Sequence, residues 1–192
     1  MNRVVLKYWY IITQCIYKRK FKTIGKGSVV YKPLQFNSVH SISLGSNVYI
    51  AEGSWLIGND EKDITLTIAD GTTIGHFVHI VARESVEIQE KVLIADKVFI
   101  TDSSHGYEDI SKPVLEQDNI LLRTVTIGEG SWLGDNVSVC GANIGKHCVI
   151  GANSVVVKDI PDYCVAVGNP ARVIKKYNFE SQKWEPCKSQ TH

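Results

Sequence analysis

The sequence predicts a mainly β protein built as a solenoid of short strands, and two observations lead to this prediction. An aliphatic residue recurs at every sixth position, followed by a small residue and then by turn-forming residues. Neither the three-and-four spacing of an amphipathic helix nor the strict alternation of a flat strand fits this pattern. A short strand followed by a tight corner does fit it, and stacked corners of this kind share one apolar interior.

The six-residue repeat covers most of the chain after residue 40. It pauses at a charged insertion, 58–63, and at a longer irregular segment, 106–123, and it returns at Ile127. The small residue after the aliphatic one, such as Gly128, fits a corner where the backbone turns or passes close to other atoms. Each coil cannot bury its apolar face alone, so about a dozen repeats in register predict a continuous stack.

Length and composition indicate one domain with short appendages. The chain has 21 basic and 20 acidic side chains, so charge gives no reason to expect nucleic acid as a partner. The five cysteines include no CxxC pair, which argues against a zinc site or a disulfide framework and for reduced thiols in the cytoplasm. No apolar run approaches the ~20 residues of a membrane-spanning helix.

Residues 1–23 form a basic and aromatic segment for which we expect a helix. Its apolar residues lie between Lys7 and the basic run 18–20, and the features of a cleaved signal peptide are missing. Two hypotheses stay open for this helix. It packs against the end of the main domain, or it makes a peripheral contact with anionic lipid at the inner face of the membrane.

Two motifs identify a family resemblance. They are IGKHCVIGANSVVVKDIPDYCVAVGNPARVIK at 144–175 and ITDSSHGYEDISKPV at 100–114. With them, residues 24–175 resemble the hexapeptide-repeat acetyltransferases. The first motif is similar to the closing coils and coenzyme A site of the galactoside and maltose O-acetyltransferases. The second is closer to the O-acetyltransferases that modify surface polysaccharides.

The resemblance implies a left-handed parallel β-helix of triangular section over residues 24–175. The segment 106–123 would protrude from it as a loop, and 176–192 would form a C-terminal extension. The resemblance further implies an enzyme that uses acetyl-CoA, assembles as a homotrimer and needs no metal. Its expected reaction is transfer of an acetyl group to a sugar hydroxyl of a surface polysaccharide or its precursor, in the cytoplasm.

His105 is the residue to which the resemblance assigns catalysis. An imidazole titrates near pH ~6.5, so it can accept a proton from an alcohol at neutral pH. The family uses the His at the start of the irregular segment as general base, and no cysteine is expected to form a covalent intermediate. A carboxylate or carbonyl should orient the imidazole, and Asp102, Glu108 and Asp109 all remain candidates.

The resemblance also implies binding residues. For the acceptor these are His79, Tyr107 and Trp132, although Trp132 also fits a subunit interface. Small residues would leave room for the pantetheine arm, and basic residues would meet the coenzyme phosphates. The coenzyme-binding residues implied are Gly134, Ala152, Lys158, Arg172 and Lys175.

Two positions depart from the family pattern. Ser103 stands where polysaccharide-modifying relatives often have a second His, and Gly75 stands where galactoside-type enzymes have an acceptor-binding Asn. His76 and His79 are candidates to replace that Asn, and each also fits a solvent-facing corner. These departures leave the identity of the acceptor open.

Three other functions were considered. A zinc carbonic anhydrase on the same fold needs three His ligands at defined spacing, which His76, His79 and His105 do not provide. A non-catalytic solenoid subunit would have no use for the His105 motif. An N-acyltransferase acting on an amino sugar remains open, because the same base and coenzyme site serve an amine.

Overall fold

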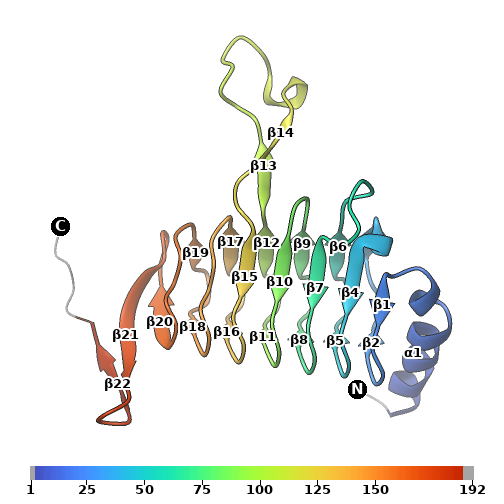
Figure 1. The fold of residues 1–192 in the computed structure, drawn as a ribbon, viewed down its shortest axis with the longest axis horizontal. Coiled ribbons are helices and arrows are strands. Elements are labelled where there is room, and N and C mark those ends of the chain that lie inside the picture. Colours follow the sequence, from blue (N-terminus) through green and yellow to red (C-terminus); the bar gives the residue numbers. More distant parts are fainter. Residues whose placement is uncertain (1–2, 188–192) are drawn as a thin grey trace.

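The computed structural model, which describes residues 3–187, is a three-sided solenoid with one helix at its N-terminal end (Figure 1). The first five coils each contribute one short strand to each of three sheets, and equivalent residues of successive coils lie in register. In one sheet, for example, Ile68 pairs with Ile88 and Ile88 with Ile127, all in parallel. In the later coils the first sheet continues only as isolated bridges at Ile144 and Ile160. The predicted fold class, mainly β with stacked parallel coils and a short N-terminal helix, is confirmed.

The first sheet consists of β1 (Thr23–Ile24), β4 (Ile42–Leu44), β7 (Leu66–Ile68), β10 (Val86–Ile88) and β15 (Val125–Ile127). The second consists of β2 (Val29–Val30), β5 (Tyr49–Ile50), β8 (Thr73–Ile74), β11 (Leu93–Ile94), β16 (Trp132–Leu133), β18 (Val149–Ile150), β20 (Cys164–Val167), β21 (Arg172–Asn178) and β22 (Lys183–Pro186). The third consists of β3 (Gln35–Asn37), β6 (Trp55–Ile57), β9 (His79–Val81), β12 (Phe99–Thr101), β17 (Ser138–Cys140) and β19 (Val155–Val156). The remaining elements are α1 (Arg3–Cys15), the hairpin strands β13 (Ser103–His105) and β14 (Asn119–Leu121), and the 3-10 turns η1 (Tyr17–Arg19), η2 (Val39–Ser41) and η3 (Val114–Glu116).

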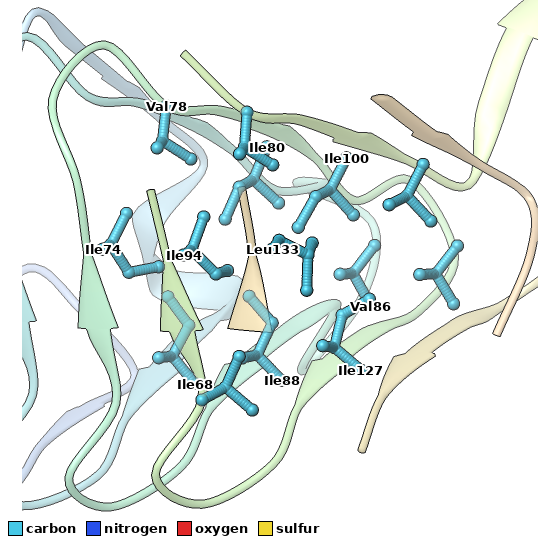
Figure 2. Packing of buried hydrophobic residues seen from close by; sticks show 14 of the residues in the cluster. Ile68, Ile74, Val78, Ile80, Val86, Ile88, Ile94, Ile100, Ile127 and Leu133 are labelled. Atoms are coloured by element: carbon cyan, nitrogen blue, oxygen red, sulfur yellow. The ribbon is translucent and has the colours of Figure 1, made fainter. Parts of the chain in front are cut away.

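The aliphatic residues of the repeat fill the interior of the solenoid (Figure 2). Within one coil they lie six residues apart, and Ile88, Ile94 and Ile100 all have no exposed surface. Each therefore contributes roughly 1.5–3 kcal/mol of hydrophobic stabilisation. The side chains next to these inward positions, such as Glu87 and Leu93, point outward, so their identity is not fixed by the core.

The small residue of the repeat lies where one coil corner stacks closely on the next. A Cβ atom added to Gly128 would lie 2.4 Å from the carbonyl carbon of Gly145, which occupies the same position one coil later. Such a contact is too short for any side chain. The close approach expected from the sequence at this corner is therefore present.

The two ends of the solenoid are covered by different elements. Helix α1 lies over the first coil, where the Val30 N–H donates to the Thr13 hydroxyl at 2.9 Å, and Gln14 donates to the carbonyls of Gly25 and Ser28. At the other end β20, β21 and β22 form an antiparallel extension. Within residues 3–187, no helix has the length and apolar character needed to span a membrane.

Candidate active site

A β-hairpin projects from the third sheet directly after β12, and it carries His105 (Figure 1). Its strands β13 and β14 pair in antiparallel fashion, with His105 opposite Asn119. The Gly106 N–H donates to the Asp118 carbonyl at 2.9 Å and extends the pairing by one residue. The segment predicted as a loop thus begins as an ordered hairpin, and the His105 imidazole is exposed at its base.

A cavity of about 450 Å³ lies between the base of this hairpin and the outer face of the third sheet. Its walls come from four neighbouring coils and from both hairpin strands. His79 and His105, separated by 26 positions in the sequence, both line it. The lining residues are Ile57, His79, Val81, Arg83, Phe99, Thr101, Ser103, Ser104, His105, Asn119, Leu122 and Cys140.

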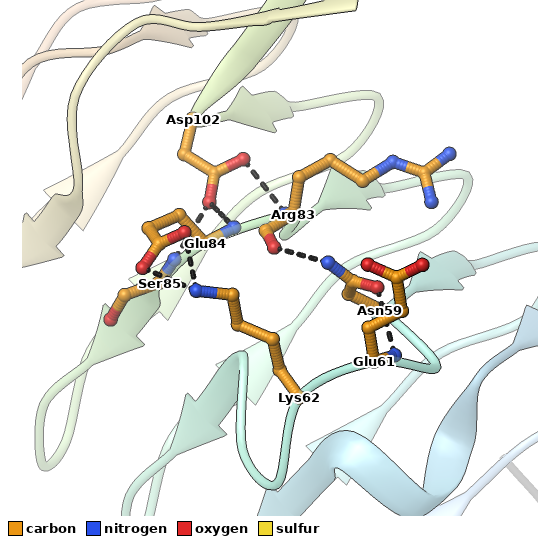
Figure 3. A network of polar contacts seen from close by, with 7 residues as sticks. All are labelled: Asn59, Glu61, Lys62, Arg83, Glu84, Ser85 and Asp102. Atoms are coloured by element: carbon orange, nitrogen blue, oxygen red, sulfur yellow. Dashed lines mark hydrogen bonds and ion pairs between the residues drawn. The ribbon is translucent and has the colours of Figure 1, made fainter.

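Asp102 anchors the hairpin to the solenoid. Its side chain is fully buried, and its carboxylate accepts three backbone N–H groups, from Arg83 at 2.9 Å, Glu84 at 2.7 Å and Ser85 at 2.8 Å (Figure 3). Three N–H donors satisfy the buried charge. Both carboxylate oxygens are therefore used to join β12 to the corner at 83–85.

The other two candidates for orienting His105 lie in the outer part of the hairpin. Asp109 accepts hydrogen bonds from the N–H and hydroxyl of Ser111 and forms an ion pair with Lys112 at 3.5 Å, and these hydrogen bonds lower the pKa of its carboxyl. Glu108 is exposed. Within residues 3–187, no hydrogen bond or ion pair joins the His105 imidazole to another side chain.

His79 is a wall of the cavity rather than a solvent-facing corner. Its ring stacks on Trp55 of the preceding coil, with centroids 4.3 Å apart and planes 9° from parallel, and it contacts Phe99 of the next coil at 5.2 Å. Burial lowers its pKa, so the imidazole is neutral at physiological pH. Its Nε2 atom is buried and has no partner among the described residues. A ligand in the cavity could supply that partner.

His76, by contrast, is a corner residue. Its exposed ring Nδ1 lies 3.2 Å from the Asp96 carboxylate, and the His76 backbone N–H donates to the same carboxylate at 2.7 Å. This backbone hydrogen bond is the main cause that lowers the pKa of the Asp96 carboxyl. Of the two histidines considered as replacements for the missing Asn, only His79 lines the cavity.

One cysteine lies in the cavity, and the expectation that no cysteine forms a covalent intermediate stays a prediction. Cys140 follows Val139 at the end of β17 and lines the same cavity as His105. Burial raises its pKa, so the side chain is a protonated thiol and a weak nucleophile. The raised pKa of Cys140, and not its distance from His105, therefore argues against a cysteine intermediate.

The other predicted acceptor residues lie outside this cavity. Tyr107 is 62% exposed beyond the base of the hairpin, and Trp132 is 47% exposed on β16 of the second sheet. Two of the predicted coenzyme residues, Gly134 and Ala152, follow strands of the second sheet. The Gly134 N–H donates to the Ile150 carbonyl at 2.9 Å, and a Cβ on Gly134 would lie 2.8 Å from the Ala152 nitrogen.

The three predicted phosphate-binding residues are exposed on the C-terminal coils. Lys158 follows β19, whereas Arg172 and Lys175 belong to β21. A hydrogen bond from the Ala171 N–H to the Val155 carbonyl, 2.8 Å long, joins β21 to β19. A single chain therefore holds the cavity on the third sheet and most of the predicted coenzyme residues on the second, whereas Lys158 follows β19 of the third.

Sequence reasoning missed most of the lining residues, including Arg83, and the supporting residue Trp55. Arg83 lines the cavity from the corner after β9, and Trp55 carries the His79 ring. Both residues could have been found from their positions in the repeat. Trp55 and His79 occupy equivalent positions of successive coils, and Arg83 lies two residues past β9. Finding them required the strand register as well as the repeat.

The three-sided solenoid and the histidine-bearing hairpin define the class of transferases built from hexapeptide repeats. A model of this family, described as bacterial transferase hexapeptide (six repeats), matches residues 124–158. The chain is 31% identical over 166 residues to galactoside O-acetyltransferase of Escherichia coli K12, covering 86% of this chain and 68% of that protein. The chain belongs to the hexapeptide-repeat transferase family.

Two further comparisons agree with this assignment. The chain is 45% identical over 124 residues to "Putative lipopolysaccharide biosynthesis O-acetyl transferase WbbJ" of Escherichia coli K12, covering 61% of this chain and 63% of that protein, or about three fifths of its length. AntD, an N-acyltransferase from Bacillus cereus solved with dTDP and 3-hydroxybutyryl-CoA, superposes with a TM-score of 0.72 at 18% identity, covering 88% of this chain and 90% of that one. At that identity the likeness concerns the fold.

Proposed function

We propose that this protein is an acetyl-CoA-dependent O-acetyltransferase that acts on a sugar hydroxyl, with His105 as general base. The observation that carries the proposal is the cavity shared by His105 and His79 in a member of this transferase family. The names of two relatives, one of lipopolysaccharide biosynthesis and one acting on galactosides, support a sugar or a polysaccharide precursor as acceptor.

The proposed reaction is a direct transfer. The His105 imidazole takes the proton of the acceptor hydroxyl, and the oxygen attacks the thioester carbonyl of acetyl-CoA. The C–O bond forms, and the tetrahedral oxyanion collapses by breaking the C–S bond. The coenzyme leaves as its thiol after receiving the proton from the imidazolium. Neutral His79 would bind the acceptor through the Nε2 atom that lacks a partner.

The coenzyme is expected on the C-terminal coils. The close stacking of Gly134 on Ala152 leaves no side chain between coil backbone and an extended pantetheine arm. Lys158, Arg172 and Lys175 would contact the phosphates through charge-assisted hydrogen bonds.

A parallel homotrimer would bring these two parts together. In a single chain the cavity lies on the third sheet, whereas Trp132 and Gly134 belong to the second. If the second sheet of one subunit faces the third sheet of its neighbour, the active site forms between them, with Trp132 and Tyr107 at its edges. Light scattering of the purified protein measures whether the trimer forms.

Thiol release from acetyl-CoA tests the proposal. The wild-type protein is assayed with neutral sugars, acidic sugars and sugar nucleotides, beside the His105→Ala variant. Release that depends on both His105 and an acceptor supports the enzyme. Product analysis then separates an ester from an amide, which decides between the O-acetyltransferase and the alternative of an amino-sugar N-acyltransferase. Absence of coenzyme binding in calorimetry would favour a non-catalytic subunit.

We also propose that α1 contacts the inner face of an anionic membrane, in the cytoplasm where thiols stay reduced. The helix packs on the first coil by one face only. Its other face presents Val4, Tyr8 and Ile11, which are 74%, 61% and 50% exposed and share one side of the helix. Exposed apolar residues beside basic ones favour binding in a lipid interface.

The charge distribution supports this contact. Residues 1–51 contain eight basic and no acidic side chains, whereas residues 52–192 contain 13 basic and 20 acidic ones. A positive end of this kind is attracted to anionic lipid. Sedimentation with phosphatidylcholine vesicles, with and without phosphatidylglycerol, tests the contact. The Val4→Ser/Ile11→Ser variant should stay in solution, whereas the control Leu115→Ser, at a 94% exposed hairpin position, should still bind.

A further inference from the structure

Arg83 is held rigidly at the edge of the cavity. It lies in the corner between β9 and β10, where its N–H donates to Asp102 at 2.9 Å and its carbonyl accepts from the Asn59 amide at 2.9 Å (Figure 3). Both backbone groups are therefore fixed by side chains from neighbouring coils. The backbone of Arg83 is therefore held in place at the edge of the cavity.

The guanidinium group of Arg83 has no partner among residues 3–187, although the side chain is partly buried. Two of the acidic side chains near it have other partners. Asp102 is saturated by backbone N–H groups, and Glu84 forms an ion pair with Lys62 at 2.6 Å. Figure 3 shows the guanidinium directed away from the Asp102 carboxylate. The guanidinium nitrogens are not among the buried atoms that lack a partner, so the group is open to solvent and to a ligand.

The cavity itself has a positive character. Its lining includes Arg83, whose side chain is always charged, and none of the lining residues is Asp or Glu. A guanidinium presents a planar fork of N–H donors that matches carboxylate and phosphate oxygens. A volume of about 450 Å³ suits a small-molecule ligand of the size of a substituted monosaccharide.

We propose that Arg83 binds an oxyanion carried by the acceptor, so that the preferred substrate is an anionic sugar. The inference rests on the proposed function, because His105 in the same cavity would act on a hydroxyl of that sugar. The oxyanion is a carboxylate, as in a uronic acid, or a phosphate, as in a sugar phosphate or a sugar nucleotide. Arg83 is then a specificity-determining residue.

Steady-state kinetics with matched acceptors test this assignment. The acceptors are a neutral hexose, the corresponding hexuronic acid, the hexose 1-phosphate and a nucleoside diphosphate hexose. Arg83→Gln should lower kcat/KM by about 10- to 100-fold for the anionic acceptor that wild type prefers, the usual effect of a charge-assisted hydrogen bond. The neutral hexose should be unaffected. Whether the uronic acid or a phosphate is preferred identifies the anion.

Arg123→Gln is the matched control. Arg123 is exposed and forms an ion pair with Asp159 at 3.0 Å, outside the cavity lining. It should leave acceptor preference unchanged. Arg83→Lys keeps the positive charge but loses the planar set of N–H donors, so it should retain part of the preference for anionic acceptors.

If Arg83→Gln lowers kcat/KM equally for neutral and anionic acceptors, the proposal is overturned. A raised KM for acetyl-CoA with an unchanged KM for the acceptor would overturn it as well. Calorimetric titration of the hexuronic acid and the hexose 1-phosphate into both proteins decides the matter without catalysis. If wild type transfers no acyl group but binds an anion that Arg83→Gln does not bind, the proposed reaction fails and the Arg83 site stands. Efficient transfer to neutral sugars alone leaves the reaction standing and removes the site.

Discussion

The His79 ring lies flat against the Trp55 indole of the preceding coil, with centroids 4.3 Å apart and planes 9° from parallel. The pair follows directly from the register of β6 and β9, which places the two residues opposite each other on the outer face of the third sheet. Phe99 of β12 continues the row. The row forms a rigid aromatic wall that keeps His79 facing the cavity.

The first prediction concerns the pH dependence of stability. Because burial lowers the pKa of His79, the unfolded chain binds more protons than the folded one just below pH ~6.5. The free energy of unfolding should therefore fall as pH drops below about 6.5, until the folded-state pKa is reached. In His79→Phe this part of the pH dependence should disappear.

Urea unfolding between pH ~5 and ~8 measures the effect. Phe99→Leu is the control, because it disturbs the same aromatic row without removing a titrating group. It should lower stability at every pH and keep the wild-type slope. An unchanged slope in His79→Phe would contradict a neutral, buried imidazole.

The second prediction concerns catalysis. His105→Ala should reduce acyl transfer by about 10²- to 10⁴-fold, the usual contribution of a positioned general base. The exposed imidazole at the hairpin base makes no described hydrogen bond, so the thermal unfolding midpoint should stay near that of wild type. His40→Ala removes an exposed imidazole paired with Asp60, away from the cavity, and should keep full activity. Wild-type rates in His105→Ala would remove the mechanism.

The third prediction concerns Asp102. Asp102→Asn keeps one acceptor oxygen but places an amide NH2 against a backbone N–H donor, in a fully buried position. We expect a loss of about 3 kcal/mol in the free energy of unfolding, since buried hydrogen bonds to a charged group contribute about 1.5–3 kcal/mol each.

Asp70→Asn is a suitable comparison for Asp102. Asp70 accepts one N–H, from Ser46 at 2.7 Å, at an exposed corner, and an amide oxygen can still accept it. Its loss should be well below that of Asp102→Asn in the same denaturant titration. Similar small losses in both variants would mean that Asp102 does not anchor the hairpin.

Much of the fold could be predicted from the sequence, because the repeat marks every inward position. The six-residue spacing alone predicts that Ile88, Ile94 and Ile100 are buried, as they are. The outward positions carry no such signal, since solvent, a partner and a cavity all accept them. One wall of the cavity consists of four residues that pair in register across four coils, namely Ile57, Val81, Thr101 and Cys140. Only the strand register shows that they lie side by side. Arg83 was missed for the same reason.

The candidate site could be predicted in part. His105 was found by a resemblance of its motif, and its shared cavity with His79 depends on how the hairpin folds back over β9 and β12. Trp132 and Tyr107 do not reach that cavity within one chain. If a neighbouring subunit completes the site, as proposed above, the spacing of residues along a single sequence cannot show it.

The last prediction concerns the cavity cysteine. Cys140 shares the cavity with His105, and a thiolate there would compete as nucleophile for the acetyl thioester. Burial raises its pKa, so the thiol form prevails at neutral pH and attack by the acceptor oxygen is favoured. Cys140→Ser should therefore keep acyl transfer close to the wild-type rate. Mass spectrometry of wild type quenched during turnover should find Cys140 unmodified, with Cys148, whose pKa burial raises to about 11, as an internal reference for an inert thiol. Loss of activity in Cys140→Ser together with an acetyl group trapped on Cys140 in wild type would replace direct transfer with a two-step mechanism.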